Sequence, residues 1–373
     1  MSSFADFKLL PTLQASLAEM GLTTPTQIQT RAIPALMAGK SVIGLSETGS
    51  GKTLAFALPV LHMLKSLENE GNTVTLVSRP RAVVIVPARE LGDQVTRVFK
   101  PFTHTTRLRV RSVLGGSKFD TAKRSVSGGF EVLIATPGRL LQLMDRALVS
   151  LEDVRILVFD EADRMLDQGF LPAASRIAGD CPPTRQLALF SATVSPKVQT
   201  LINQLFAGAE LIKSEGSHKV VPTLNTVNLN VPDGKRFPFL EDLMTKKIEG
   251  GTLIFTNTRD QCDDLADKIR QSGRECLVYR GEMDKRVRRA NLKTFREGGI
   301  KFLISTDLAS RGLDVDHVGR VINYHLPADL ENYLHRVGRT ARAGRKGVVI
   351  NLVTERDAPL MGRLGSINGK PAQ

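Results

Sequence analysis

The sequence contains no tryptophan and only three tyrosines, which excludes a binding surface built mainly from stacked indole and phenol rings. Its three cysteines, at positions 181, 262 and 276, have no CxxC spacing. This argues against a zinc site or a disulfide framework and is typical of reduced thiols in a cytoplasmic protein. No stretch approaches the roughly 18 consecutive apolar residues of a membrane-spanning helix. The N-terminal sequence MSSFADFKLL also lacks the basic and apolar regions of a signal peptide. We therefore expect a soluble, cytoplasmic protein that does not bind membranes.

Positive charge, in contrast, is abundant. The chain has 51 Lys and Arg residues against 38 Asp and Glu, which gives a formal net charge of +13. Such an excess favours a polyanionic partner, nucleic acid ahead of an anionic membrane. The 373 residues exceed what a single hydrophobic core usually contains, and 42% of them are hydrophobic. We therefore expect two domains, each with a core of its own.

Short β-branched runs recur along the chain, and each is followed by apolar residues at helical spacing. The runs are Val42–Leu45, Ala82–Val86, Val132–Ala135, Ile156–Phe159, Leu187–Phe190, Thr252–Phe255, Glu275–Tyr279, Phe302–Ser305, Val321–Tyr324 and Val348–Leu352. Apolar strands that alternate with helices are typical of parallel sheets covered on both faces. The pattern predicts an α/β fold with two doubly wound parallel-sheet domains. The polar stretch KSEGSHK, residues 213–219, is the expected linker between domains of residues 1–212 and 220–373.

A glycine-rich stretch, SETGSGKT, follows the first predicted strand. Gly49 and Gly51 let the backbone turn its N–H groups toward an anion, and the helix that begins near Thr53 adds its positive end. Lys52 can then reach the β- and γ-phosphates of a nucleotide, and the Thr53 hydroxyl can bind Mg²⁺. Ser46 stands where the usual pattern has Gly; because it is small, we expect the loop to form. The other residues predicted to bind nucleotide in this loop are Thr48 and Ser50.

Acidic residues cluster in the sequence VFDEADRML. The apolar strand Ile156–Phe159 delivers Asp160 and Glu161 to its C-terminal end, where open α/β sheets bind ligands. One carboxylate there can hold the Mg²⁺ of a nucleotide, and a second can orient and deprotonate water for attack on the γ-phosphate. We assign the first role to Asp160 and the second to Glu161. Acidic residues are also common in the first turn of a helix, but the phosphate-binding loop upstream favours the catalytic interpretation.

With these motifs the chain resembles the DEAD-box RNA helicases, whose other motifs follow in order to about residue 350. The resemblance implies two tandem RecA-like domains. The segment GLTTPTQIQ resembles the adenine-reading Q motif, in which Gln29 would contact the base, and Phe4 lies upstream, where an aromatic residue of the family usually stacks on the base. Leu22 and Gln27 replace residues that are common in the family. The same segment also fits a capped turn that leads into a helix.

The resemblance further implies where RNA binds. In the first domain, PAREL, Gly115–Gly116 and TPGR resemble segments that contact the RNA backbone, although Ala88 stands where the family more often has Thr. In the second domain, LIFTNT and STDLASRGLD match motifs for RNA binding and ATP coupling. The implied RNA contacts are Pro87, Arg89, Gly115, Gly116, Thr136, Gly138, Arg139, Thr256, Asn257 and Thr306. The implied ATP contacts from the second domain are Gly312 and Asp314.

The segment HRVGRTARAGR resembles the one that supplies arginine fingers, here Arg339 and Arg342. A planar guanidinium suits the charge that spreads over the phosphoryl oxygens in the transition state. Arg336, Arg339 and Arg342 recur every three residues, so we expect one helical face to present all three, although a basic face that binds RNA or solvent also fits each of them. The predicted catalytic set is Glu161, Asp160, Lys52, Arg339 and Arg342. The residues that the resemblance assigns to coupling hydrolysis with unwinding are Asp163, Ser191, Thr193, His335 and Arg336.

Some positions of the second domain depart from the family pattern. Arg280 stands where His is common, Lys285 where Gln is common, Ser310 where Ala is common and Ala341 where Gly is common. None of these changes removes a predicted phosphate or magnesium ligand. Those at Arg280 and Lys285 bear on RNA binding and on its coupling to ATP.

Together these features predict an RNA helicase that uses ATP and Mg²⁺ and separates duplexes locally and non-processively through domain closure. The expected partner is RNA, single-stranded or duplex, contacted mainly through its backbone. We expect a monomer whose RNA target is chosen by partner proteins or by a segment outside this sequence. A rival from another class is an ATP-gated RNA clamp or assembly platform with slow turnover, and a DNA helicase or translocase is a third reading.

Overall fold

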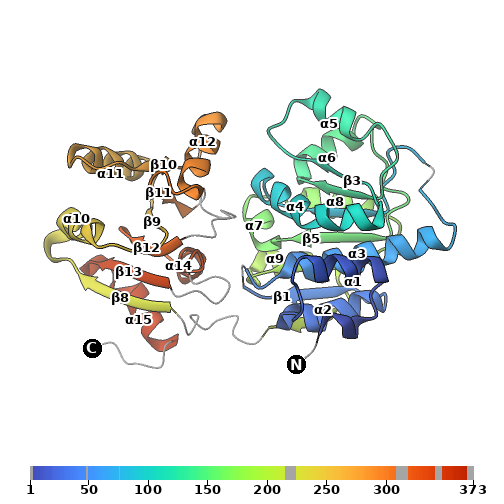
Figure 1. The fold of residues 1–373 in the computed structure, drawn as a ribbon, viewed down its shortest axis with the longest axis horizontal. Coiled ribbons are helices and arrows are strands. Elements are labelled where there is room, and N and C mark those ends of the chain that lie inside the picture. The colour runs from blue at the N-terminus through green and yellow to red at the C-terminus, as the bar shows by residue number, and fades with distance from the viewer. Residues whose placement is uncertain are drawn as a thin grey trace. The chain divides into compact units, whose positions relative to one another are not determined.

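The computed structural model describes residues 3–47, 49–74, 76–214, 224–307, 318–340 and 347–367. The chain divides into two compact units, Met1–Ser217 and His218–Gln373, and each contains one parallel sheet with helices on both faces (Figure 1). The predicted α/β fold with two doubly wound sheets is therefore confirmed. The predicted linker lies mostly outside the described residues, so the domain limits stay a prediction. Within the described ranges, no helix is both long and apolar enough to cross a membrane.

The sheet of the first unit has seven strands in the order β3-β4-β2-β5-β6-β1-β7, all parallel. The strands are β1 (Val42–Leu45), β2 (Ala82–Ile85), β3 (Val110–Val113), β4 (Val132–Ala135), β5 (Ile156–Asp160), β6 (Gln186–Ser191) and β7 (Glu210–Lys213). β5 lies at the middle of this order. Its carboxyl end, which carries Asp160, is therefore flanked by strands on both sides.

Two hydrophobic clusters cover the faces of this sheet. In β5, Ile156 and Val158 belong to one cluster, and Leu157 and Phe159 belong to the other, as expected for side chains that alternate across a strand. The first face is covered by α1 (Pro11–Glu19), α2 (Gln27–Met37), α3 (Lys52–Asn69) and α4 (Arg89–Thr106). The second is covered by α5 (Phe119–Ser125), α6 (Pro137–Met144), α7 (Ala162–Asp167), α8 (Leu171–Gly179) and α9 (Pro196–Leu205). A short 3₁₀ helix, η1 (Phe4–Phe7), precedes α1.

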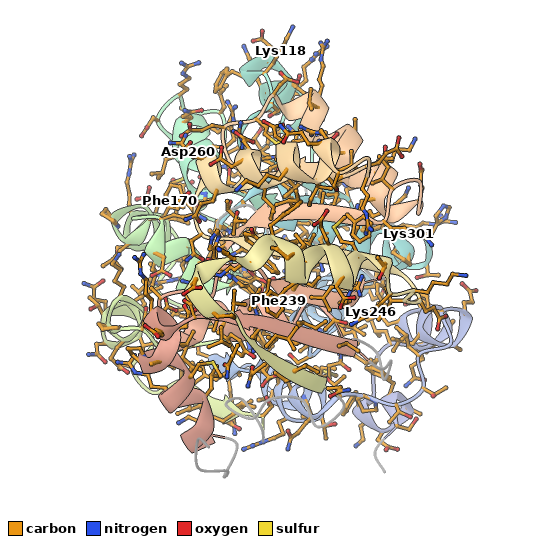
Figure 2. The ribbon with its side chains drawn as sticks, turned by 90° about the vertical axis from the view of Figure 1, so that its left-hand side faces the viewer. Lys118, Phe170, Phe239, Lys246, Asp260 and Lys301 are labelled. Carbon is orange, nitrogen blue, oxygen red and sulfur yellow. The ribbon has the colours of Figure 1, made fainter. Side chains whose placement is uncertain are left out.

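The sheet of the second unit has six parallel strands in the order β10-β11-β9-β12-β13-β8. The strands are β8 (Leu224–Asn230), β9 (Gly251–Thr256), β10 (Leu277–Tyr279), β11 (Phe302–Thr306), β12 (Val318–Asn323) and β13 (Gly347–Val353). One face packs against α10 (Arg236–Thr245) and α11 (Arg259–Gln271). The other packs against α12 (Lys285–Arg296), α14 (Leu330–Val337) and α15 (Ala358–Ile367). Figure 2 shows α10 across the sheet, with Phe239 on the helix and Lys246 at its C-terminal end.

Candidate active site

The glycine-rich loop joins β1 to α3 in the first unit. Gly49 and Gly51 both have a φ of +88°, a left-handed conformation that glycine adopts readily. Ser46, at the start of the loop, is buried; its N–H donates to the Ser191 carbonyl at 3.0 Å, and its hydroxyl lies 2.7 Å from that of Ser50. The loop therefore forms with serine in place of the usual glycine. Thr48 lies outside the described residues.

Lys52 begins α3 and is buried against the loop. Its ammonium donates hydrogen bonds to the carbonyl oxygens of Ser46 and Glu47, at 2.6 and 2.8 Å. These acceptors are neutral, so a phosphate oxygen would offer the ammonium a stronger, charged partner. Thr53, next along the helix, is half-buried in the first turn of α3. Its neighbours at the N-terminus of the helix are the backbone N–H groups that favour anions.

Gln29 connects the Q-motif segment to the loop. Its side-chain oxygen accepts from the Thr26 N–H at 2.9 Å, and its amide nitrogen donates to the Gly51 carbonyl at 3.0 Å. The side chain thus caps α2 and holds the loop at the same time. Phe4 is also buried, with its ring edge-on to Phe7 at a centroid distance of 5.8 Å. The roles of Gln29 and Phe4 in binding adenine stay predictions.

Asp160 and Glu161 lie where β5 ends and α7 begins. Asp160 is buried, and burial, followed by the charge of Glu161, raises the pKa of its carboxyl to about 7, an effect that the Lys52 ammonium opposes. The Glu161 N–H donates to Asp160 Oδ1 at 3.0 Å. Glu161 has a φ of +49° and ψ of 54°, so its backbone is left-handed at the turn between strand and helix. Asp160 is therefore at the C-terminal end of β5, close enough to Lys52 for the ammonium charge to act on its carboxyl.

Asp163 joins this segment to the SAT motif. Its Oδ2 accepts hydrogen bonds from the N–H groups of Ala192 and Thr193 at 3.1 and 3.0 Å, and from the Thr193 hydroxyl at 3.1 Å. In the opposite direction, the Asp163 N–H donates to the Ser191 hydroxyl at 3.2 Å. The three residues assigned to coupling in this unit are thus in direct contact. Their coupling role stays a prediction.

The residues predicted to bind RNA in the first unit follow three adjacent strands. Pro87 and Arg89 follow β2, Gly115 and Gly116 follow β3, and Thr136–Arg139 follow β4. The carboxyl ends of parallel strands lie at one edge of a sheet, so these segments are neighbours. The Gly115 N–H donates a hydrogen bond to the Thr136 hydroxyl at 2.9 Å, and Arg139 Nη2 donates one to the Ser117 carbonyl at 2.6 Å. Gly138 lies in the first turn of α6, at the start of the same segment.

In the second unit, the buried guanidinium of Arg336 is the centre of a polar network. It donates to both Asp307 oxygens at 2.5 and 2.7 Å, to the Asn257 and Asn323 side chains at 2.8 and 3.2 Å, and to the His325 carbonyl at 2.5 Å. Thr256 and Thr306 end strands β9 and β11 and are buried; each directly precedes a partner of Arg336 in the sequence. Arg336 thus positions the strand-end residue Asn257.

The prediction that one helical face presents three arginines is wrong. α14 ends at Val337, so Arg339 follows the helix in a turn, where its N–H donates to the Arg336 carbonyl at 3.1 Å. Arg336 itself points into the strand ends and is 1% exposed, because the carboxylate and carbonyl groups there capture its guanidinium. Arg342, Gly312 and Asp314 lie outside the described residues, as does the side chain of His335.

Comparison with known proteins identifies the family. Residues 26–201 match the DEAD/DEAH box helicase family, and residues 235–344 match the Helicase conserved C-terminal domain. The chain is 36% identical over 361 residues to RNA helicase CrhR of Synechocystis sp., which covers 96% of this chain and 71% of the relative. It is 33% identical over 357 residues to the DEAD-box ATP-dependent RNA helicase CshA of Geobacillus kaustophilus, with 96% and 74% covered. The structure of S. cerevisiae Dbp5 bound to RNA and ADP BeF3 resembles it with a TM-score of 0.87 at 30% identity, covering 100% of this chain and 95% of that one.

This chain belongs to the DEAD-box family of ATP-dependent RNA helicases. The predicted family, the fold class of two RecA-like units and the enzyme class are confirmed. The roles of the individual site residues stay predictions and are proposed below.

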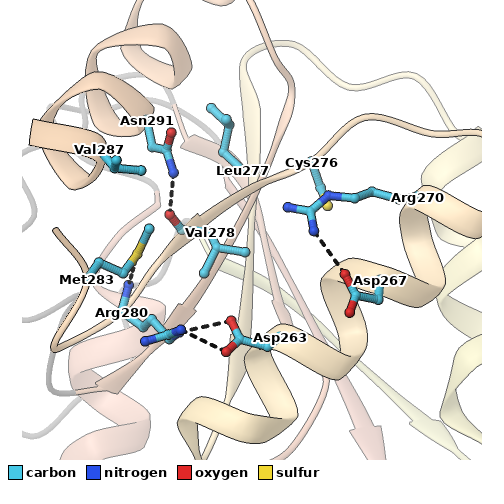
Figure 3. Close-up of a pocket in the computed structure, with 10 residues that line it drawn as sticks. All are labelled: Asp263, Asp267, Arg270, Cys276, Leu277, Val278, Arg280, Met283, Val287 and Asn291. Atoms are coloured by element: carbon cyan, nitrogen blue, oxygen red, sulfur yellow. Dashed lines mark hydrogen bonds and ion pairs between the residues drawn. The ribbon is translucent and has the colours of Figure 1, made fainter.

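Arg280, where DEAD-box helicases commonly have His, is held by a carboxylate of its own unit. Its guanidinium binds Asp263 through Nε and Nη2, at 2.9 and 2.8 Å (Figure 3). The pair lies at a pocket of about 480 Å³ between α11, β10 and α12, which the sequence did not indicate. The residues that line it are Asp263, Asp267, Arg270, Cys276, Leu277, Val278, Arg280, Met283, Val287 and Asn291. The arginine therefore pairs locally with α11.

Sequence reasoning also missed a contact inside the DEAD segment. Arg164 Nη1 donates to Glu161 Oε2 at 2.5 Å, and both side chains are buried. Their spacing of three residues is compatible with a pair, but Glu161 precedes α7 in a left-handed turn that the sequence does not indicate. The consequence of this pair for the reaction is argued below.

Proposed function

We propose that this DEAD-box protein separates RNA duplexes locally and non-processively, and that ATP hydrolysis and domain closure drive the separation. The observation that carries the proposal is the contact of Asp163 with Ser191, Ala192 and Thr193. It ties the segment that holds the nucleotide-site carboxylates to a second strand end, so a change at the nucleotide can be transmitted away from it.

The donor set fits a nucleotide-bound Mg²⁺. Asp160 is a buried carboxyl at a strand end, and carboxylate and hydroxyl oxygens are the ligands that Mg²⁺ prefers. Among the described residues, no group of three His, Cys, Asp or Glu side chains could hold a metal by itself. This agrees with an ion that is shared with substrate phosphates. Asp160 and Thr53 would hold it, in part through water, and when bound it would neutralise phosphate charge.

The chain's own residues divide the hydrolytic work. The loop of Ser46–Thr53 would bind the phosphates, with the Lys52 ammonium moved from carbonyl partners to phosphate oxygens. Glu161 would take a proton from water as the water oxygen bonds to the γ-phosphorus and the bond to the β-phosphate oxygen breaks. Arg339 and Arg342 would stabilise the charge that develops on the phosphoryl oxygens. Gln29 and Phe4 would hold the adenine.

RNA is the proposed substrate because the strand-end segments suit a nucleic acid backbone. They offer glycines, hydroxyls, backbone N–H groups and arginines, which contact phosphate and 2′-OH groups without reading sequence. The structural relative Dbp5 was solved with RNA bound, which supports the same ligand here. We also propose a cytoplasmic monomer whose RNA target is chosen by protein partners.

Closure follows from linked binding. ATP and RNA would each bind more tightly to a state in which residues of both units contribute, so each would favour that state for the other. Closure would bend one RNA strand out of duplex geometry and release its complement. Hydrolysis would then reopen the protein.

A strand-displacement assay tests this proposal. We expect a short RNA duplex to be separated with ATP, the rate to fall steeply with duplex length, and both Lys52→Ala and Glu161→Gln to be inactive. Lys65→Ala serves as the matched control, since it removes a half-buried lysine of the same helix α3 that pairs with Glu68 instead of the loop. ATP hydrolysis without displacement, together with a long-lived RNA complex, would contradict unwinding and support the clamp.

A further inference from the structure

Glu161 and Arg164 form a short ion pair that is mostly shielded from solvent. The side chains are 11% and 7% exposed, and the Nη1 to Oε2 distance is 2.5 Å. Removing two charges from water is unfavourable, so a buried pair needs good geometry and further hydrogen bonds to compensate. Here the two residues belong to one short segment, and Glu161 is the carboxylate proposed to activate water.

The backbone conformation of Glu161 determines where its side chain points. Glu161 is left-handed, with a φ of +49°, at the junction of β5 and α7. A residue other than glycine is uncommon there, and its side chain leaves the chain in a direction that neither strand nor helix would give. The helix then places Arg164 one turn further on, where its guanidinium meets the carboxylate.

Arg164 has donor capacity that this contact does not use. Its Nε is buried and makes no hydrogen bond with any described residue. A guanidinium presents five N–H donors in a planar fork, so it can hold a carboxylate and still donate to another acceptor. Buried donors without a partner are rare in native proteins.

We infer that Arg164 is a positioning residue for ATP hydrolysis, which holds the Glu161 carboxylate in place for the attacking water. The inference rests on the proposed role of Glu161. Arg164 acts through Glu161 and contributes nothing to nucleotide binding by itself. Its removal lets the carboxylate rotate away from the position in which it receives the proton, and small displacements of a catalytic group are costly in rate.

The test is a double-variant cycle measured under saturating ATP and RNA. Arg164→Met keeps an apolar side chain at the buried position and removes the guanidinium. We expect kcat to fall by about 100-fold, with little change in KM for ATP. Arg164→Lys keeps the charge but not the fork, and should restore part of the loss. Combining Arg164→Met with Glu161→Gln should be no slower than Glu161→Gln alone, since residues that act as a unit are not additive.

The control is Arg176→Met, which removes an arginine from an exposed pair with Asp145 at the same distance of 2.5 Å in the same unit. The inference is overturned if Arg164→Met turns over like the control, if its loss adds to that of Glu161→Gln, or if it loses ATP binding together with turnover. An active Glu161→Gln would instead overturn the proposed role of Glu161, and the inference with it. An inactive Glu161→Gln variant together with a normal Arg164→Met variant would overturn the role of Arg164 and leave that of Glu161 intact.

Discussion

The surroundings of Asp160 raise the pKa of its carboxyl strongly. Burial at the end of β5 is the main cause that raises the pKa of its carboxyl to about 7, and the neighbouring charge of Glu161 adds to it. In the unfolded chain the same group has a pKa near 3.8. Near neutral pH the folded chain therefore holds a carboxylate in a place that disfavours its charge, which is the environment a cation would relieve.

Replacement of Asp160 by Asn should stabilise the nucleotide-free protein in a manner that depends on pH. The pKa is raised on folding, so the stability that Asp160 contributes is fully present below pH 3.8 and is lost as the pH rises to about 7. The neutral amide does not suffer this loss. We expect the gain in free energy of unfolding to be roughly 2 kcal/mol larger near pH 8 than near pH 5, because one pKa unit is worth about 1.4 kcal/mol.

Urea unfolding of the protein in EDTA measures this gain, with Asp264→Asn on the exposed side of α11 as the control. The control should show no such dependence on pH. An equal gain from Asp160→Asn at both pH values would mean that the carboxyl does not titrate in this range.

At the scale of elements, the phosphate-binding loop and α2 are held together by one side chain. Gln29 donates to the carbonyl of Gly51, whose φ is +88°. A Cβ added at Gly51 would lie 2.3 Å from Gln29 Nε2, a distance that forces the amide to move. Gly71, after α3, has a similar φ of +84°, and a Cβ there would meet nothing within 4 Å.

These two glycines give a matched comparison. Gly51→Ala and Gly71→Ala should both lose about 1 kcal/mol of stability from the left-handed backbone. Only Gly51→Ala should lose roughly 1 kcal/mol more, because it breaks the Gln29 hydrogen bond. Thermal unfolding without nucleotide measures both losses. Equal losses would show that Gln29 does not hold the loop.

α14 is anchored to the second sheet through Arg336. The guanidinium is 1% exposed, pairs with Asp307 and lies 5.0 Å from the centre of the Phe255 ring. Arg336→Met should therefore destabilise the protein by about 3–5 kcal/mol, since it removes a buried guanidinium from the half-buried Asp307 carboxylate and the buried Asn323 side chain. Arg336→Lys should recover little, because an ammonium cannot reproduce the planar fork. Arg270→Met, which removes an exposed pair with Asp267, should cost less than about 1 kcal/mol. Urea unfolding of the full chain compares the three variants, and a small loss for Arg336→Met would contradict the anchor.

The elements differ in how well the sequence predicted them. Interior strands such as β5 were predicted because both of their faces are apolar. The strands β3 and β7 were not, since they lie at the two edges of the first sheet and bury little: only one residue of each is fully buried. Periodicity also failed for Arg336, whose side-chain direction is set by the half-buried Asp307 carboxylate, and for Arg339, which lies beyond the end of α14.

The candidate site was predicted to a similar extent. The family resemblance grouped Asp163 with Ser191 and Thr193, and the structure brings these residues into contact although they are far apart in the sequence. The contact of Arg164 with Glu161 was not predicted, because it depends on the left-handed turn at Glu161, and no residue type announces that turn. Gln29 was predicted at the nucleotide site, but its contact with the loop requires the folded positions of α2 and α3.

At the scale of the whole molecule, the proposed chemistry is divided between the two units. Lys52, Asp160 and Glu161 belong to the first, and Arg339 to the second. A site that is completed by both units would hydrolyse ATP slowly until a second ligand favours its completion. The net charge of +13 and the strand-end segments of each unit make RNA the ligand proposed for that role.

The central claim is therefore that RNA activates this site, and steady-state ATPase activity tests it most directly. Turnover is measured alone, with single-stranded RNA, and with DNA of the same length and sequence, using Glu161→Gln as the inactive control. We expect strong stimulation by RNA, little by DNA, and none in the variant. Equal stimulation by DNA would contradict an RNA-specific helicase and favour a DNA helicase or translocase, and stimulation that survives in Glu161→Gln would contradict the proposed catalytic carboxylate.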